Sequence, residues 1–185
     1  MNRQFIALVA GIPALLLVAL LLWSTVSTNG SLGRPGVNDK FGRIELSTPY
    51  EVDFNLDTLS GNHVQLSALR DQIVMVDFWS SWCPPCIQEG PVLAQAYDKW
   101  HSQGVEFVGI AIWDDETPIR DFVSKHNTRY PNAMDPTGST AIDFGVKGLP
   151  EKFFFNRKGQ VVRKYIGPIT ATDLDRILTT LITVR

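Results

Sequence analysis

The chain has 185 residues, of which 19% are charged, and a formal net charge of -2 at pH 7. This length suits one domain with an appendage better than two domains. Charges of both signs are scattered and no long basic run is present, which argues against nucleic-acid binding. Only two cysteines occur, Cys83 and Cys86. Because a domain of about 130 residues can fold without disulfide staples, this pair indicates reactivity rather than stapling.

Residues 1–26 are predicted to form a transmembrane signal anchor with a short cytoplasmic N-terminus. No charged residue lies between Phe5 and Val26, and a helix of about 20 apolar residues spans a bilayer core. A cleavable signal peptide is the alternative, but its apolar core is shorter and no clear Ala-x-Ala site follows this run. Since Arg3 favours a cytoplasmic N-terminus, we expect a single-pass protein of the cell inner membrane, with its domain on the periplasmic, extracytoplasmic side.

The next segment, residues 27–50, is rich in Ser, Thr, Asn, Gly and Pro, a composition typical of a flexible stalk. A globular domain is expected over residues 51–185. It opens with two alternating segments, 53–57 and 63–66, separated by the turn residues Ser60-Gly61-Asn62. This pattern predicts a β-hairpin.

The rest of the domain predicts strands and helices in alternation. Residues 73–79 form a nearly continuous apolar run, which predicts a strand buried on both faces. Further strands are expected at 105–113, 152–155 and 160–165, and helices at 87–100, 118–125, 140–144 and 172–182. The order hairpin–βα–βα–ββ–α predicts an α/β fold with a mixed central sheet flanked by helices. Trp113, Phe122 and Phe144 are interpreted as core residues.

The cysteines directly follow the strand at 73–79, at the predicted start of a helix. Free N–H groups and the helix dipole there stabilise a thiolate at Cys83. Cys86 lies nearly one turn later, within disulfide reach, so we expect the outer sulfur to attack a partner and the inner one to resolve the mixed disulfide. Pro84 and Pro85 occupy early helical positions and remove two possible donors to the thiolate. Half a zinc site and a static structural disulfide are the alternatives.

Two stretches carry a family resemblance. The segment Val76-Asp-Phe-Trp-Ser-Ser-Trp-Cys-Pro-Pro-Cys86 resembles the active-site segment of the thioredoxin superfamily, and Pro91 falls where those proteins carry a helix-kinking proline. The stretch from Asp135 to Glu151, which ends Gly-Val-Lys-Gly-Leu-Pro-Glu, resembles the cytochrome c biogenesis thioredoxins of the CcmG/DsbE type, and the TlpA/ResA relatives share most of it. The resemblance covers roughly residues 54–181 and implies a thioredoxin-like fold.

The resemblance also implies roles for individual residues. Pro150 matches the cis-proline opposite the cysteines, and the backbone of Leu149 would pair with an incoming extended peptide. Asp77 matches a buried acid that accepts the proton of Cys86, and Glu89 matches a second acidic residue near the site. The respective alternatives are an ordinary trans proline that starts an edge strand, a solvated aspartate and a surface glutamate.

Three more residues receive roles from the resemblance. Glu151 belongs to the Pro-Glu pair of the cytochrome type and is a candidate for proton transfer or partner docking, with a solvated glutamate as the alternative. Trp82 is expected to shield Cys83 and, with Pro84 and Pro85, to shape the partner surface. Trp79 flanks the cysteines too, and a core role is its alternative.

The implied function is a protein-disulfide reductase on the outer face of the membrane. Its expected substrate is apocytochrome c or a cytochrome maturation thiol protein, and its reductant a membrane electron carrier. The redox-active disulfide Cys83–Cys86 is the only redox group expected, without metal or organic cofactor. A general reductase or oxidase of the TlpA/ResA type, a peptide-docking module and a peroxiredoxin-like peroxidase are the alternatives.

Overall fold

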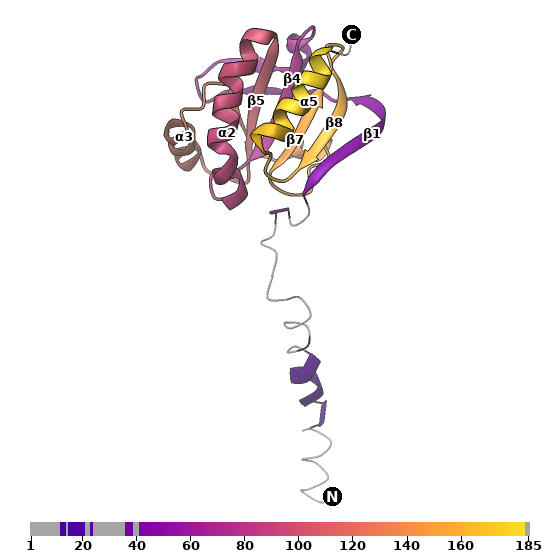
Figure 1. Ribbon diagram of the computed structural model, residues 1–185. Helices are drawn as coiled ribbons and strands as arrows, with labels where there is room; N and C mark the ends of the chain where they lie inside the picture. The colour runs from indigo at the N-terminus through magenta and orange to yellow at the C-terminus, as the bar shows by residue number, and fades with distance from the viewer. Residues whose placement is uncertain (1–11, 14, 21–22, 24–35, 39–40, 184–185) are drawn as a thin grey trace, which may run out of the picture. The chain divides into compact units, whose positions relative to one another are not determined.

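The computed structural model describes residues 12–13, 15–20, 23, 36–38 and 41–183 (Figure 1). The chain divides into two compact units, Met1–Arg34 and Pro35–Arg185. In the first unit, the described residues are helical. The anchor predicted over residues 1–26 lies largely outside the described residues, and among those described no helix has the length and apolarity needed to cross a membrane.

The second unit is built on a six-stranded mixed sheet with the strand order β1-β8-β7-β4-β5-β6 (Figure 1). Its strands are β1 (Gly42–Glu51), β4 (Ile73–Trp79), β5 (Val105–Ile112), β6 (Asn132–Asp135), β7 (Glu151–Phe155) and β8 (Gln160–Ile166). Strands β4, β5 and β6 are parallel, whereas β7, β8 and β1 pair antiparallel with their neighbours. Every residue of β4 is buried, which confirms the prediction of a strand covered on both faces.

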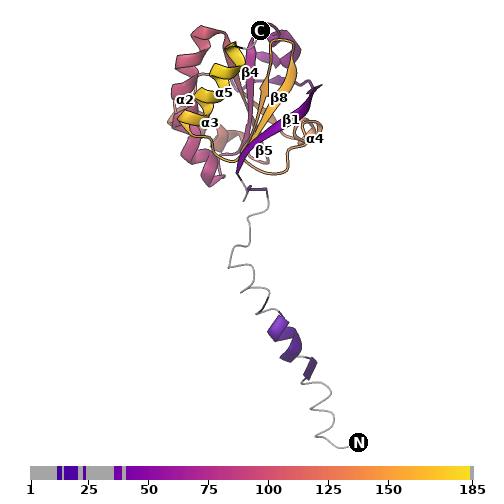
Figure 2. The same cartoon turned by 45° about the vertical axis from the view of Figure 1, so that its right-hand side comes forward.

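Helices cover both faces of this sheet. On one face lie α2 (Pro84–Trp100) and α5 (Ala171–Thr183), and on the other lie α3 (Glu116–Lys125) and the short α4 (Ser139–Asp143). The side chains of β4 alternate between the two faces and divide the core in the same way. Met75 packs with α2 and α5, while Phe78 packs with α3 and α4. Figure 2 shows the strands between the α2–α5 layer and α4. The predicted α/β fold with a mixed sheet is confirmed.

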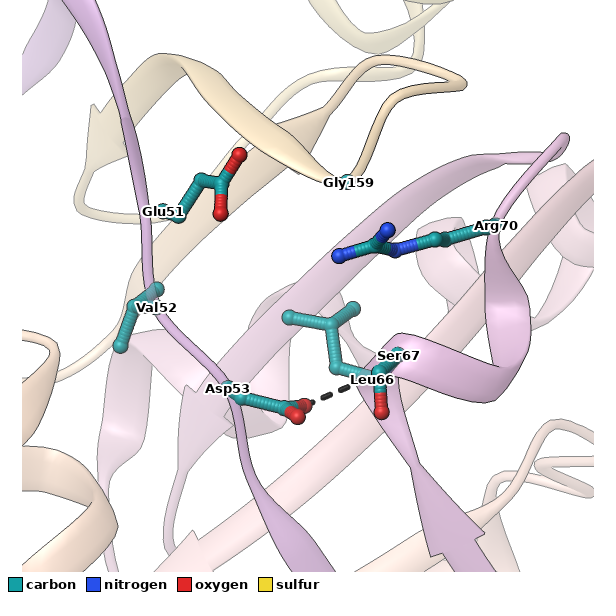
Figure 3. Close-up of a pocket in the computed structure, with 7 residues that line it drawn as sticks. All are labelled: Glu51, Val52, Asp53, Leu66, Ser67, Arg70 and Gly159. Atoms are coloured by element: carbon teal, nitrogen blue, oxygen red, sulfur yellow. Dashed lines mark hydrogen bonds between the residues drawn. The ribbon is translucent and has the colours of Figure 1, made fainter.

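A separate antiparallel hairpin, β2 (Asn55–Asp57) and β3 (His63–Gln65), confirms the prediction for this region. A 3₁₀ turn, η1 (Leu66–Leu69), follows it, and the backbone N–H of Ser67 donates to Asp53 Oδ1 at 3.1 Å. This bond closes one side of a pocket of about 290 Å³ (Figure 3), which is lined by Glu51, Val52, Asp53, Leu66, Ser67, Arg70 and Gly159. None of the predicted site residues lines this pocket.

The stalk prediction is wrong for residues 42–50, which belong to β1. This strand pairs antiparallel with β8 from Gly42↔Ile166 to Glu51↔Gln160, with an irregularity between Glu45 and Tyr50. Pairing satisfies backbone groups that an open edge of β8 would leave without partners. The strand was not evident in the sequence because it is largely exposed and carries no sustained apolar alternation. Residues 36–38 and 41 of the predicted stalk are also described, whereas 27–35 and 39–40 lie outside the described residues.

Candidate active site

The two cysteines form a disulfide at the start of α2, with their Cα atoms 5.3 Å apart. Cys83 is the N-cap of the helix in extended conformation, and Pro84 and Pro85 occupy its first two positions. Proline suits these positions because helical N–H groups there have no intrahelical acceptor. The structure therefore confirms the predicted placement of Cys83, Pro84, Pro85 and Cys86.

One backbone donor is directed at the Cys83 sulfur. The N–H of Cys86 lies 3.3 Å from Cys83 Sγ, while Pro84 and Pro85 have no N–H to offer. A thiolate at Cys83 would thus receive the helix dipole and a single backbone hydrogen bond. Both cysteines are buried, with Cys83 0% and Cys86 1% exposed. Cys83 was expected as the outer, attacking cysteine, yet in this structure it is as buried as its partner.

A buried ionic cluster lies on the side of the sheet that α2 covers. Asp77 of β4 and Lys152 of β7 are directly opposed residues of the antiparallel pair, and Lys152 Nζ lies 3.0 Å from Asp77 Oδ1. The same ammonium group donates to Glu89 Oε1 at 2.5 Å. Glu89 shares the buried face of α2 with Cys86, three residues earlier. All three charged side chains are nearly inaccessible to solvent.

Glu89 also fixes the segment before α5. Its second oxygen, Oε2, accepts the backbone N–H of Ile169 at 2.9 Å, and Lys152 Nζ lies 3.4 Å from the carbonyl oxygen of Gly167. Lys152 Nζ donates hydrogen bonds to Glu89 Oε1 and to the Gly167 carbonyl oxygen, whereas its contact with Asp77 Oδ1 has an ion-pair distance without hydrogen-bond alignment. The solvated alternatives for Asp77 and Glu89 are therefore wrong.

The charges of this cluster do not balance, because two carboxyl groups share one ammonium group. Burial raises the pKa of Glu89 to about 8, against the lowering effect of Lys152. Burial likewise raises the pKa of Asp77, again opposed by Lys152. Burial alone would lower the pKa of Lys152, but the charges of Asp77 and Glu89 outweigh it, so that pKa rises. The arrangement can hold a proton near neutral pH and exchange it.

Opposite the cysteines in the predicted scheme is Pro150, and the structure confirms that the Leu149–Pro150 peptide bond is cis. Leu149 is fully buried. Its backbone N–H and carbonyl groups, expected to receive a partner peptide, are bonded to residues 36 and 38 of this same chain.

Glu151 directly follows Pro150. Because successive side chains of β7 point to opposite faces of the sheet, Glu151 lies on the face opposite to Lys152. It is fully buried, forms an ion pair with Lys164 at 2.5 Å, and accepts the backbone N–H of Lys147 at 3.1 Å. The alternative of a solvated glutamate is wrong. Glu151 is not part of the Asp77–Lys152–Glu89 cluster.

The tryptophans near the cysteines differ in how exposed their side chains are. Trp79 is buried and packs on Phe122 at a centroid distance of 4.3 Å, which supports the core alternative. Trp82 is 37% exposed, and its indole N–H donates to the carbonyl oxygen of Trp113 at 2.8 Å. Interpreting Trp113 as core is wrong: it is half exposed, with a left-handed φ of 55° just beyond β5. Phe122 and Phe144 are buried as predicted.

Two parts of the site escaped sequence reasoning. Lys152 was read only as the first residue of a strand, although a lysine beside three consecutive phenylalanines is an unusual neighbour for a buried strand. Residues 36–38 fell inside a region interpreted as stalk. No local pattern signals their pairing, because the partner, Leu149, is more than 100 residues away.

Comparison with known proteins agrees with this geometry. Residues 51–164 match the AhpC/TSA family. The chain is 30% identical over 126 residues to the thiol-disulfide oxidoreductase ResA of Bacillus cereus, covering 68% of this chain and 73% of that protein.

Two solved structures are also similar. A thiol:disulfide interchange protein of the thioredoxin family from Chlorobium tepidum shares 28% identity at a TM-score of 0.66, covering 74% of this chain and 99% of that one. A secreted Mycobacterium tuberculosis disulfide oxidoreductase homologous to E. coli DsbE shares 28% identity at a TM-score of 0.64, covering 69% and 96%. The chain therefore belongs to the AhpC/TSA family and is a thiol-disulfide oxidoreductase of the DsbE/ResA type.

Proposed function

We propose that this oxidoreductase is a reductase on the outer face of the cell inner membrane, acting in cytochrome c biogenesis. Its substrate would be a disulfide of apocytochrome c or of a cytochrome maturation thiol protein. The Gly-Leu-Pro-Glu stretch at residues 148–151 and the similarity to a DsbE homologue support this choice. The uncharged run from Phe5 to Val26 supports an N-terminal anchor.

The observation that carries the electron direction is that, among the residues the structure describes, a single N–H group donates to Cys83 Sγ. A dithiol becomes an oxidant when its reduced form is strongly stabilised. Here the two prolines remove backbone donors at the first two helical positions, leaving only the N–H of Cys86 at 3.3 Å. The reduced form consequently gains little from hydrogen bonding, which favours donation of electrons to the partner.

The proposed reaction uses the buried acids for one proton transfer. The Cys83 thiolate attacks one sulfur of the partner disulfide, and the other partner sulfur leaves as a thiolate. Cys86 then loses its proton to the Asp77–Lys152–Glu89 cluster and attacks Cys83 Sγ. The second partner sulfur leaves and is protonated, so that two electrons have passed to the partner and the protein holds its disulfide. A membrane electron carrier would return the disulfide to the dithiol.

The reduction potential of the Cys83–Cys86 pair, equilibrated with glutathione, tests the direction. We expect a value near the thioredoxin value of about −270 mV. A value near that of DsbA, about −120 mV, would make the protein an oxidase and contradict the proposal.

The substrate is tested with the full chain carrying Cys86→Ala, which cannot resolve a mixed disulfide. We expect it to be trapped through Cys83 by an oxidised peptide containing the haem-attachment sequence Cys-x-x-Cys-His. A peptide of the same length with two cysteines in unrelated sequence is the control. Equal trapping of both peptides would favour the second candidate, a general extracytoplasmic reductase, which the identity to ResA supports.

A further inference from the structure

The backbone edge of Leu149 is already occupied by a segment of the same chain. Residue Val37 forms a parallel bridge with Leu149. The N–H of Leu149 donates to the carbonyl oxygen of Gly36 at 2.7 Å, and the N–H of Asn38 donates to the carbonyl oxygen of Leu149 at 2.9 Å. Both segments belong to the unit Pro35–Arg185. Residues 36–38 therefore lie where a partner peptide was expected to add by β-augmentation.

Side chains make this contact specific. The side-chain amide of Asn38 donates to the carbonyl oxygen of Pro150 at 3.1 Å. Gly148, which precedes Leu149, lies close to the same side chain. A Cβ atom added to Gly148 would be only 2.7 Å from Asn38 Oδ1. The glycine at 148 thus leaves the space that Asn38 fills.

Gly36 is fitted to the two exposed tryptophans. Its φ of +85° is one that favours glycine, and an added Cβ would lie 3.0 Å from the Trp113 ring and 3.8 Å from the Trp82 ring. Trp82 is itself held by its hydrogen bond to the carbonyl oxygen of Trp113. A side chain at position 36 would have to displace the rings beside Cys83.

This arrangement excludes a partner in two ways. The single N–H of Leu149 is used by Gly36, so it cannot also donate to a partner strand. Cys83 has no exposed surface, so a partner sulfur cannot reach it without a movement of the residues around it.

We propose that residues 36–38 form a strap that occupies the partner-docking edge, and that a partner reaches Cys83 only when the strap leaves. This proposal rests on the proposed use of the Leu149 edge as the docking site. The strap also indicates the kind of partner that fits: an extended segment, with a glycine or another small residue where Gly36 lies against Trp113 and Trp82.

The test uses the full chain with Gly36→Val. This substitution adds a side chain at a position where the positive φ and the nearby Trp113 ring both disfavour it. Gly61→Val is the matched control, because Gly61 has a similar φ of +81° in the hairpin turn and has nothing within 4 Å of an added Cβ. Asn38→Ala is a milder second variant that loses only the side-chain bond to Pro150. The measurement is the rate at which iodoacetamide alkylates Cys83 in the reduced proteins, with circular dichroism to verify folding.

Because each net hydrogen bond changes an opening equilibrium several-fold, we expect Gly36→Val to raise the alkylation rate on the order of tenfold and Asn38→Ala about threefold. Gly61→Val should react like the parent. If both folded strap variants are alkylated at the parent rate, the strap proposal is wrong. If Gly36→Val does not fold, the alkylation rate of Asn38→Ala decides alone. Alkylation needs no protein substrate, so a fast strap variant that still fails to reduce the cytochrome peptide would reject the proposed substrate but not the strap.

Discussion

Lys152 and Glu151 are neighbours on β7, yet they belong to two different buried ion clusters on opposite faces of the sheet. Lys152 is shared by two acids, Asp77 and Glu89. On the other face, Glu151 forms an ion pair with Lys164, which remains 13% exposed. The second pair is matched one to one and lies at the edge of solvent. The Asp77–Lys152–Glu89 cluster has one carboxyl group more than it has cations. That additional carboxyl group can hold a proton, so the cluster is more than a structural ion pair.

The largest expected effect comes from removing the cation of each cluster. Lys152→Met leaves two buried acids without a counter-charge, and we expect it to lower the free energy of unfolding by about 3–5 kcal/mol at pH 7. Lys164→Met should cost less, about 1–2 kcal/mol, since it leaves one buried acid rather than two and Glu151 keeps the N–H of Lys147. Urea denaturation followed by tryptophan fluorescence measures both. Equal losses would mean that the excess acid has no energetic consequence.

Asp77→Asn and Glu151→Gln test which of the two clusters takes part in catalysis. The variant keeps the shape of the side chain but cannot accept a proton from Cys86, and we expect resolution of the mixed disulfide to slow about 10- to 100-fold at pH 7. Glu151→Gln, on the opposite face, should slow it far less. Rapid-quench measurement of the lifetime of the mixed disulfide gives both rates. An unchanged lifetime in Asp77→Asn would remove Asp77 from the proton path.

A smaller effect is expected in the pH dependence of stability. Folding raises the pKa of Glu89 from 4.5 to about 8, so between these pH values the folded protein holds a proton that the unfolded chain has released. Stability from this group is therefore present at low pH and falls as the pH rises through that window. In Glu89→Gln the decline between pH 5 and pH 8 should shrink by at least about 1 kcal/mol. A decline identical to that of the parent would argue against the raised pKa.

The sequence predicted best where one local pattern determines one structure. The apolar run at residues 73–79 became β4, and the proline pair placed Cys83 at the N-cap of α2. It was weaker where a role depends on a distant residue. The partners of Lys152 come from β4 and α2, and the sequence alone does not bring these three residues together.

The two edge strands, β1 and β6, were harder to predict than the central ones. Strand β1 lies on the sheet edge and gains its stability from backbone bonds to β8, which leave no apolar pattern. Strand β6 is only four residues long and was missed entirely. Trp113 was assigned to the core because large aromatic residues are usually buried, but its left-handed backbone at the end of β5 leaves it half exposed.

The pairing of β1 with β8 has a consequence for the strap. Only three residues separate Asn38 from Gly42, where β1 begins. A connection this short keeps a released strap at an effective concentration on the order of millimolar at the Leu149 edge. Its return is a first-order process, independent of how much protein is present. A peptide that binds this edge more weakly than millimolar cannot hold it open alone, and the transient covalent bond to Cys83 would have to supply the remaining residence time.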